Sequence, residues 1–267
     1  MNKYEDCYCL FLDILGFKSL IESIEKETDK SDAIFNKTIA ALKTISRGVG
    51  YNEKIVIKGK TTDSSRKVTQ FSDSVVISYQ KGELDGSGLF SIIADVHMLQ
   101  LELIRSQIFL RGAITRGDLY HDQSFVFGPA FIEAVELEKL ANYPRVIISQ
   151  EIVSEAKIHI GNRNEERTIS SMLSKDFDGL YYIDYFNVCH ADFYEDTGAL
   201  AMYLESLRNA VKSLSSARAP SIKVKHSWLR TKFNELANTL RASDYCEYNN
   251  KTIPDSERDL FKIIKPF

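Results

Sequence analysis

The hydrophobic pattern of the chain begins with an apolar run from Tyr8 to Phe17 that is interrupted by Asp13 and Gly16. An apolar run that ends at a glycine predicts a buried strand, a turn and then a helix starting at Phe17. An ionised carboxylate is costly at the end of such a strand unless positive charge lies against it. Asp13 therefore reads either as the cap of the following helix or as a ligand of a bound cation.

A second β-prone stretch repeats this arrangement. Two strands, 67–72 and 74–80, are expected on either side of Asp73, where a tight hairpin would present the side chain. Two carboxylates at the ends of adjacent central strands can bind Mg²⁺ or Mn²⁺ together with phosphate oxygens. The alternative for Asp73 is an ordinary turn residue.

The remaining pattern alternates strands and helices over the first 150 residues. Expected helices are 17–27, 32–45, 89–106 and 130–142, and further expected strands are 52–57, 108–115, 124–128 and 145–148. Residues 58–67 are expected to form a polar loop, and Gly117-Asp118 to connect two strands. Interleaved strands, helices and hairpins predict an α+β layer of the ferredoxin-like kind.

After residue 150, the sequence pattern predicts mainly helices. A turn and late strand within 176–186 would complete the sheet edge, and helices are expected at 197–214 and 221–240. We therefore divide the chain into a domain of residues 1–190 and a helical extension, 191–267, packed on it.

Composition narrows the possible partners. The 267 residues are 44% hydrophobic and 27% charged, as in an ordinary soluble globular protein, and the net charge of −3 provides no broad cationic field for nucleic acid. Neither a membrane-length apolar run nor a signal peptide is recognisable, so we expect a cytoplasmic protein without membrane partners. The few cysteines are expected to be reduced, with Cys7 and Cys9 packed in the first strand.

A third sequence motif follows the two segments that contain Asp13 and Asp73. It runs from Leu110 to Asp118 and is followed by Phe127-Gly128-Pro129-Ala130. In order and spacing over roughly residues 5–150, the three stretches resemble the class III nucleotide cyclases. Within that family, the sequence motifs are most similar to those of the Pycsar pyrimidine cyclases of bacterial anti-phage defence. These motifs are Phe-Ser-Asp-Ser, Leu-Arg-Gly-Ala-Ile, Phe-Gly-Pro-Ala and Tyr-Pro-Arg.

The resemblance implies a metal and phosphate site near the first strand. Asp13 and Asp73 would bind two Mg²⁺ or Mn²⁺ ions, with the Ile14 carbonyl as a further ligand. The turn at Gly16, Phe17 and Lys18 would bind the phosphates through backbone N–H groups at a helix start. A tight turn, a core aromatic and a solvated lysine are the alternatives for these three residues.

Two positions depart from the purine cyclases of that family. Thr69 stands where adenylate cyclases have a base-reading lysine, and Phe125 stands where they have an aspartate. A hydroxyl and an aromatic ring suit a smaller base through one hydrogen bond and stacking. Both residues are alternatively ordinary strand residues.

The transition-state positions depart further. Ile132 and Glu136 occupy the places of the family's asparagine and arginine, so another cation would have to act, with Arg111, Lys139 and Arg145 as candidates. Arg111 is alternatively held in an ion pair with Glu133 or Glu136. The pair His121-Asp122 is expected in a turn.

These residues lead to a functional hypothesis. The resemblance implies an enzyme that converts UTP or CTP to a cyclic nucleotide and pyrophosphate, with the product sensed by a separate effector during phage infection. A catalytically silent nucleotide-binding domain and a purine cyclase are the alternatives. Because the chain has one copy of each motif, a complete site is expected to require a homodimer with composite active sites.

Overall fold

The computed structural model describes residues 3–26, 31–48, 54–57, 60–83, 88–158, 169–187, 198–241 and 265–267. The chain divides into two compact units. The first comprises Met1–Leu103 with Phe109–Asp184, and the second comprises Ile104–Ile108 with Tyr185–Phe267. The packing of a helical extension on the first domain stays a prediction.

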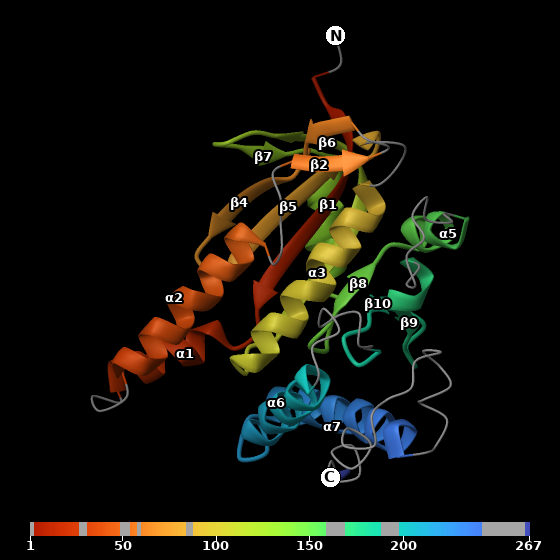
Figure 1. Ribbon diagram of the computed structural model, residues 1–267. Helices are drawn as coiled ribbons and strands as arrows, with labels where there is room; N and C mark the ends of the chain where they lie inside the picture. Colours follow the sequence, from red (N-terminus) through yellow and green to blue (C-terminus); the bar gives the residue numbers. More distant parts are fainter. Residues whose placement is uncertain are drawn as a thin grey trace. The chain divides into compact units, whose positions relative to one another are not determined.

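An eight-stranded sheet organises the first unit, in the order β4-β5-β1-β6-β8-β10-β9 with β7 paired to β6 (Figure 1). Its strands are β1 (Glu5–Ile14), β4 (Lys67–Phe71), β5 (Ser74–Gln80), β6 (Leu110–His121), β7 (Val126–Phe127), β8 (Val146–Ile148), β9 (Leu173–Lys175) and β10 (Tyr181–Ile183). The long central strand β1 is antiparallel to β5 on one side and to β6 on the other. With β4 and β5 joined in a hairpin, β4-β5-β1-β6 is the ferredoxin-like strand order, which confirms the predicted α+β class.

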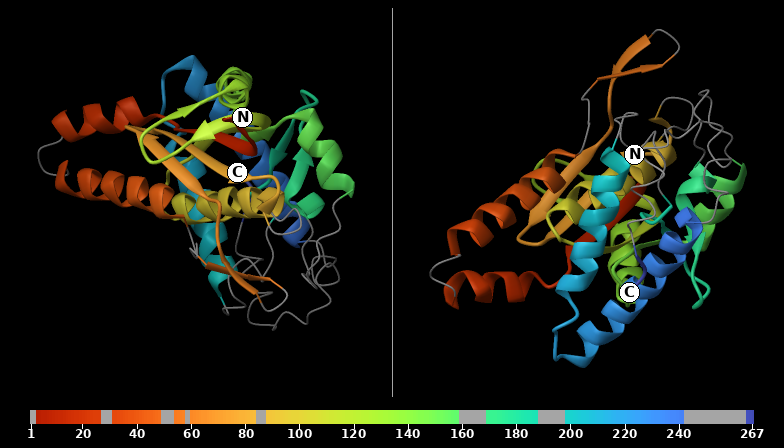
Figure 2. Two further views of the ribbon diagram at one scale, coloured as in Figure 1. Left: turned by 90° about the horizontal axis from the view of Figure 1, so that it is seen from above. Right: turned by 60° about the horizontal axis from the view of Figure 1, so that its bottom comes forward.

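Helices lie on both faces of this sheet. They are α1 (Phe17–Lys26), α2 (Ser31–Arg47), α3 (Gly88–Arg105), α4 (Pro129–Glu138), α5 (Gln150–Ile158) and the 3₁₀ turn η2 (Ile169–Met172). Seen from above, α4, in lime green, lies on the opposite side of the sheet from α3 (Figure 2, left). Helix α2 buries Thr38, Ala41 and Ile45, but α1 has no fully buried residue, so the expected helix pair covers the sheet mainly through α2.

The alternation of side chains along β1 accounts for the two layers. Cys7 and Cys9 belong to a buried cluster with Ala130 and Ala134 of α4, as expected for packed, free thiols. The intervening residues point to the other face and are also buried: Tyr8, Leu10 and Leu12. A strand that is buried on both faces has a continuous apolar sequence, as β1 has from Tyr8 to Leu12.

A glycine permits the close pairing of β1 with β6. Gly112 lies opposite Leu12, and a Cβ atom at Gly112 would lie 2.4 Å from the backbone oxygen of Phe11. Any side chain there would force the two central strands apart.

The predicted polar loop 58–67 is wrong in part. Lys60–Asp63 forms strand β3, which pairs antiparallel with β2 (Lys54–Ile57). Thr61 and Thr62 are β-branched and lie opposite Val56 and Ile55, so cross-strand pairing outweighs the polar composition of the segment.

The expected connection at Gly117-Asp118 is also wrong. Strand β6 continues to His121 because Gly117, with φ of 155°, adopts a conformation that other residues rarely take while still pairing with Cys7. The turn follows instead at Asp122, whose Oδ1 accepts hydrogen bonds from the N–H groups of Ser124 and Phe125, each at 2.7 Å. His121 itself belongs to the strand.

One helix end and two further elements differ from the sequence expectations. Helix α4 ends at Glu138, four residues earlier than expected, and α5 was not expected. The late strand is confirmed as β10, but the sheet edge is completed by β9, which precedes the turn.

The second unit contains the two expected helices, α6 (Ala199–Ser213) and α7 (Pro220–Arg241). Within it, the Tyr203 hydroxyl donates a hydrogen bond to the Tyr185 carbonyl at 2.7 Å, and Phe186 meets the Trp228 ring edge-on. Most of the C-terminal tail lies outside the described residues. None of the described helices is both long and apolar enough to cross a membrane.

Candidate active site

Two carboxylates meet at one end of the central strands. Asp13 is the penultimate residue of β1 and lies opposite Ser74, the first residue of β5. Asp73 immediately precedes Ser74 in the two-residue turn between β4 and β5, where Ser72 takes a left-handed conformation (φ of 55°). The hairpin thus presents Asp73 as predicted, and Asp73 is close enough to Asp13 to raise the pKa of the Asp13 carboxyl.

The Asp13 carboxyl loses its proton less readily than an ordinary aspartate. The pKa of Asp13 rises to about 6, first because the side chain is partly buried, and then because of its hydrogen bond to Asp73 and the charge of that residue. Arg111 opposes this rise only in part. Without a bound cation, the Asp13 carboxyl therefore keeps its proton into mildly acidic solution.

Arg111 reaches this pair from the neighbouring strand. Its Nη2 donates a hydrogen bond to Asp13 Oδ2 at 3.2 Å, and its Nε lies 2.5 Å from Glu138 Oε1 as an ion pair without hydrogen-bond geometry. The expected ion pair is present, but its partners are not Glu133 or Glu136. Ala130, Ala134 and Glu138 recur every four residues on the buried side of α4, whereas Glu133 and Glu136 lie on its exposed side.

The turn after β1 leads directly into α1. Gly16 has a φ of 81°, and its carbonyl accepts a hydrogen bond from the N–H of Leu20 as α1 begins. The first backbone N–H groups of a helix have no partners within it, so Phe17 and Lys18 offer donors there. The Lys18 side chain is 90% exposed and lies 4.0 Å from Glu22, so its charge is solvated.

The two expected base-reading residues lie in different environments. Phe125, at the tip of the β6–β7 hairpin, is 65% exposed and offers a ring for stacking. Thr69 is buried on β4, and its hydroxyl lies 2.9 Å from Nε2 of His121. The turn predicted at His121 is wrong, because β6 continues to this residue and brings it to β4, a contact that has no signal in the local sequence.

The other two cation candidates differ in availability. Lys139 follows α4 on the surface and has no ion-pair partner among the residues that the structure describes. Arg145 is fully buried, where Asp176 and Asp178 hold its guanidinium. Arg145 is therefore a structural residue that ties β8 to the turn before β10.

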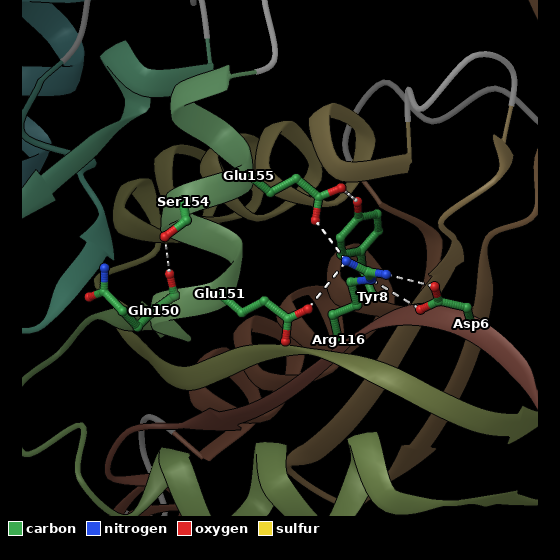
Figure 3. A network of polar contacts seen from close by, with 7 residues as sticks. All are labelled: Asp6, Tyr8, Arg116, Gln150, Glu151, Ser154 and Glu155. Carbon is green, nitrogen blue, oxygen red and sulfur yellow. Dashed lines mark hydrogen bonds and ion pairs between the residues drawn. The ribbon is translucent and has the colours of Figure 1, made fainter.

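A polar network that the sequence did not reveal anchors α5 to the sheet (Figure 3). Arg116 of β6 pairs with Asp6 at 2.9 Å, with Glu151 at 3.2 Å and with Glu155 at 3.4 Å. The Tyr8 hydroxyl donates to Glu155 at 2.7 Å, and burial, followed by this hydrogen bond, raises the pKa of Tyr8. In the same helix, the Ser154 hydroxyl donates to the Gln150 carbonyl at 3.0 Å.

The donor set at Asp13 and Asp73 suits a divalent metal that shares its coordination with a ligand. No group of three or more His, Cys, Asp or Glu side chains in the described part of the chain can hold a metal alone. Mg²⁺ is commonly held by one or two carboxylates together with substrate phosphates. Two adjacent carboxylates next to free helix N–H groups fit that mode of binding.

Comparisons with known proteins give structural neighbours only. No protein-family model matches the chain, and no curated protein matches it. The adenylyl cyclase CyaB from P. aeruginosa aligns at 14% identity with a TM-score of 0.44, covering 68% of this chain and 94% of its own. The monomeric guanylyl cyclase domain of the RhoGC fusion protein from Blastocladiella emersonii aligns at 15% identity with a TM-score of 0.42, covering 67% and 95%. Similarity at this level does not assign a function to this chain.

Proposed function

We propose that the protein is a metal-dependent nucleotide cyclase that converts UTP or CTP to the 3′,5′-cyclic nucleotide and pyrophosphate. The observation that carries the proposal is the pairing of Asp13 and Asp73 at the ends of adjacent strands, next to the helix start at Gly16. Two neighbouring carboxylates repel each other without a cation, and the N–H groups of a helix start favour an anion. A nucleoside triphosphate with divalent metal supplies both.

Each group has a role in this reaction. Asp13 and Asp73 would hold two Mg²⁺ or Mn²⁺ ions, with the Ile14 carbonyl as a further ligand. The metal, when bound, would lower the barrier to ionising the ribose 3′ hydroxyl and offset charge on the departing pyrophosphate. The N–H groups of Phe17 and Lys18 would orient the β- and γ-phosphates.

Arg111 is proposed as a positioning residue in the resting site. Its hydrogen bond to Asp13 holds that carboxylate at the end of β1, and its ion pair with Glu138 offsets part of its charge. Lys139 has no such partner in the described part of the chain, so it is the freer cation to meet charge developing on phosphorus. Because Lys139 lies at the surface, this role fits a site completed by a second copy of the chain.

Base selection is proposed to favour pyrimidines. The lysine and aspartate that read adenine in the family that the sequence resembles are replaced by Thr69 and Phe125. The exposed Phe125 ring can stack on a base, and the Thr69 hydroxyl can make one hydrogen bond. Neither residue supplies the two-point recognition that a purine edge requires.

The proposal is tested by incubating the purified protein separately with UTP, CTP, ATP and GTP in the presence of Mn²⁺ and identifying the products by mass spectrometry. A cyclic pyrimidine nucleotide is expected, and Asp13→Asn and Asp73→Asn should each abolish it. Asp118→Asn, which changes an exposed aspartate of β6, is the matched control and should retain activity. Faster turnover of ATP or GTP than of both pyrimidines would reject the base preference.

A catalytically silent nucleotide-binding domain is the second candidate. Two observations favour it: Arg111 is engaged by two carboxylates, and the exposed Ile132 and Glu136 stand where an asparagine and an arginine would be needed. Nucleotide binding without any cyclic product from the four triphosphates would support this candidate.

We further propose that the product is a signal for a separate effector in defence against phage, on the resemblance of the sequence motifs alone. Cells that carry the protein with its effector should resist infection, and Asp73→Asn should remove that resistance. Equal resistance with the variant would reject the signalling role.

A further inference from the structure

His121 lies buried between two hydroxyl groups from other strands. Its Nε2 is 2.9 Å from Thr69 Oγ1 on β4, and its Nδ1 is 2.7 Å from Ser78 Oγ on β5. Burial, reinforced by the charge of Lys67, lowers the pKa of His121 to about 4, so the ring is neutral at pH 7. A neutral imidazole has one N–H donor and one bare nitrogen acceptor. One hydroxyl must therefore donate to the ring while the other accepts from it.

The burial of Ser78 decides which hydroxyl donates. Ser78 is 2% exposed, and His121 is its one side-chain hydrogen-bond partner among the residues that the structure describes. If the ring carried its proton on Nδ1, the Ser78 proton would be buried without an acceptor, which is more unfavourable than the gain from a typical hydrogen bond. Ser78 therefore donates to Nδ1, and the Nε2–H group of His121 donates to Thr69.

This assignment leaves the Thr69 proton available. Its oxygen accepts from His121, so its own O–H group can donate to a further partner. Thr69 is 9% exposed against 2% for Ser78, so Thr69 is the less deeply buried end of the relay.

Thr69 also lies on the face of the sheet that carries Asp13. Asp13, Ser74 and Phe71 lie side by side across β1, β5 and β4, and Thr69 follows one same-face position along β4. Two strand spacings and one same-face step place the Thr69 and Asp13 Cα atoms about 12 Å apart. The hydroxyl and the carboxylate thus lie on the same face of the sheet.

We propose that the relay from Ser78 through His121 fixes Thr69 as a hydrogen-bond donor, so that the site selects bases with a ring carbonyl over bases with an amino group there. The inference rests on the proposed function, in which Thr69 contacts the base. Uracil and guanine carry oxygen where cytosine and adenine carry an amino group. Within the pyrimidines, UTP is therefore the substrate and CTP is discriminated against. His121 acts as a positioning residue, since it reaches the base only through Thr69.

The tautomer can be measured directly. Nitrogen-15 NMR of the histidine side chains separates protonated from bare ring nitrogens, and His121→Gln identifies the signals of His121. The proposal predicts a proton on Nε2 and a bare Nδ1 in the free protein. A proton on Nδ1 would overturn it, and so would a doubly protonated ring at pH 7.

Selectivity is measured by the binding of 3′-deoxy-UTP and 3′-deoxy-CTP, which cannot cyclise, and by kcat/KM for the four natural triphosphates. The wild type should favour UTP over CTP by roughly tenfold, the size of one hydrogen bond. Thr69→Val should bring the ratio close to one by weakening UTP. Ser78→Ala, which frees the tautomer, should also reduce it, while Thr38→Val in α2 should leave it unchanged.

The two proposals fail in different ways. If the wild-type protein turns over none of the four triphosphates but binds 3′-deoxy-UTP more tightly than 3′-deoxy-CTP, catalysis is rejected and the relay is supported. A preference for GTP over ATP, with both faster than the pyrimidines, would likewise reject only the pyrimidine assignment. Equal or tighter binding of the cytosine nucleotide would overturn the relay, even in an active cyclase.

Discussion

Replacing Asp73 with asparagine should stabilise the metal-free protein at neutral pH. The pKa of Asp13 is raised from 3.8 to about 6, and burial, hydrogen bonding to Asp73 and the charge of Asp73 all contribute. Because the folded state binds the Asp13 proton more tightly than the unfolded state does, stability is lost as pH rises from about 4 to about 6 and stays lower above that range.

The magnitude follows from the size of this change. A rise from 3.8 to about 6 corresponds to at most about 3 kcal/mol. Water reaches 22% of the Asp13 side chain, and burial, the largest cause, remains in the variant. We therefore expect Asp73→Asn to recover about 1 kcal/mol at pH 7.5 and close to nothing at pH 4.

Urea unfolding in the presence of EDTA at the two pH values measures this difference. Asp118→Asn is the control, since it removes an exposed aspartate elsewhere on β6 and should change stability little at either pH. If Asp73→Asn is no more stable than the wild type at pH 7.5, the two carboxylates do not repel each other and the reasoning about the site is wrong.

Three other predictions concern the fold and the assembly. Gly112→Ala should destabilise the protein by more than about 2 kcal/mol in urea unfolding, because its Cβ would meet backbone, whereas Gly82→Ala, with nothing within 4 Å, should be tolerated. Arg145→Met should reduce the free energy of unfolding by about 3–5 kcal/mol, since it leaves two carboxylates without their cation; a change below about 1 kcal/mol would contradict the buried ion pairs. Mixing inactive Asp73→Ala with inactive Lys139→Ala should restore part of the cyclase activity if two chains share a site, and a fully active monomer in light scattering would exclude sharing.

The sequence was most informative where one segment determines the structure by itself. The β1 run, the turn at Gly16 and the hairpin around Asp73 were all recognisable, because apolar continuity and turn chemistry are local properties. The ferredoxin-like order followed from the sequence of strands and helices.

The missed features depend on contacts between distant segments. Glu138 was not identified as the Arg111 partner because the buried side of α4 is set by packing on β1 and β6. His121 was assigned to a turn because only the continuation of β6 through Gly117 brings it to Thr69. Such partners are fixed by tertiary structure, and local pattern carries no signal for them.

Manganese binding in the presence of 3′-deoxy-UTP tests the central claim most directly, because it examines the paired aspartates without requiring turnover. Calorimetric titration of the wild type should show Mn²⁺ binding that strengthens when the nucleotide is present. Asp13→Asn and Asp73→Asn should each lose that nucleotide-dependent binding, while Asp118→Asn retains it. Unchanged Mn²⁺ affinity in both site variants would contradict a metal site at Asp13 and Asp73.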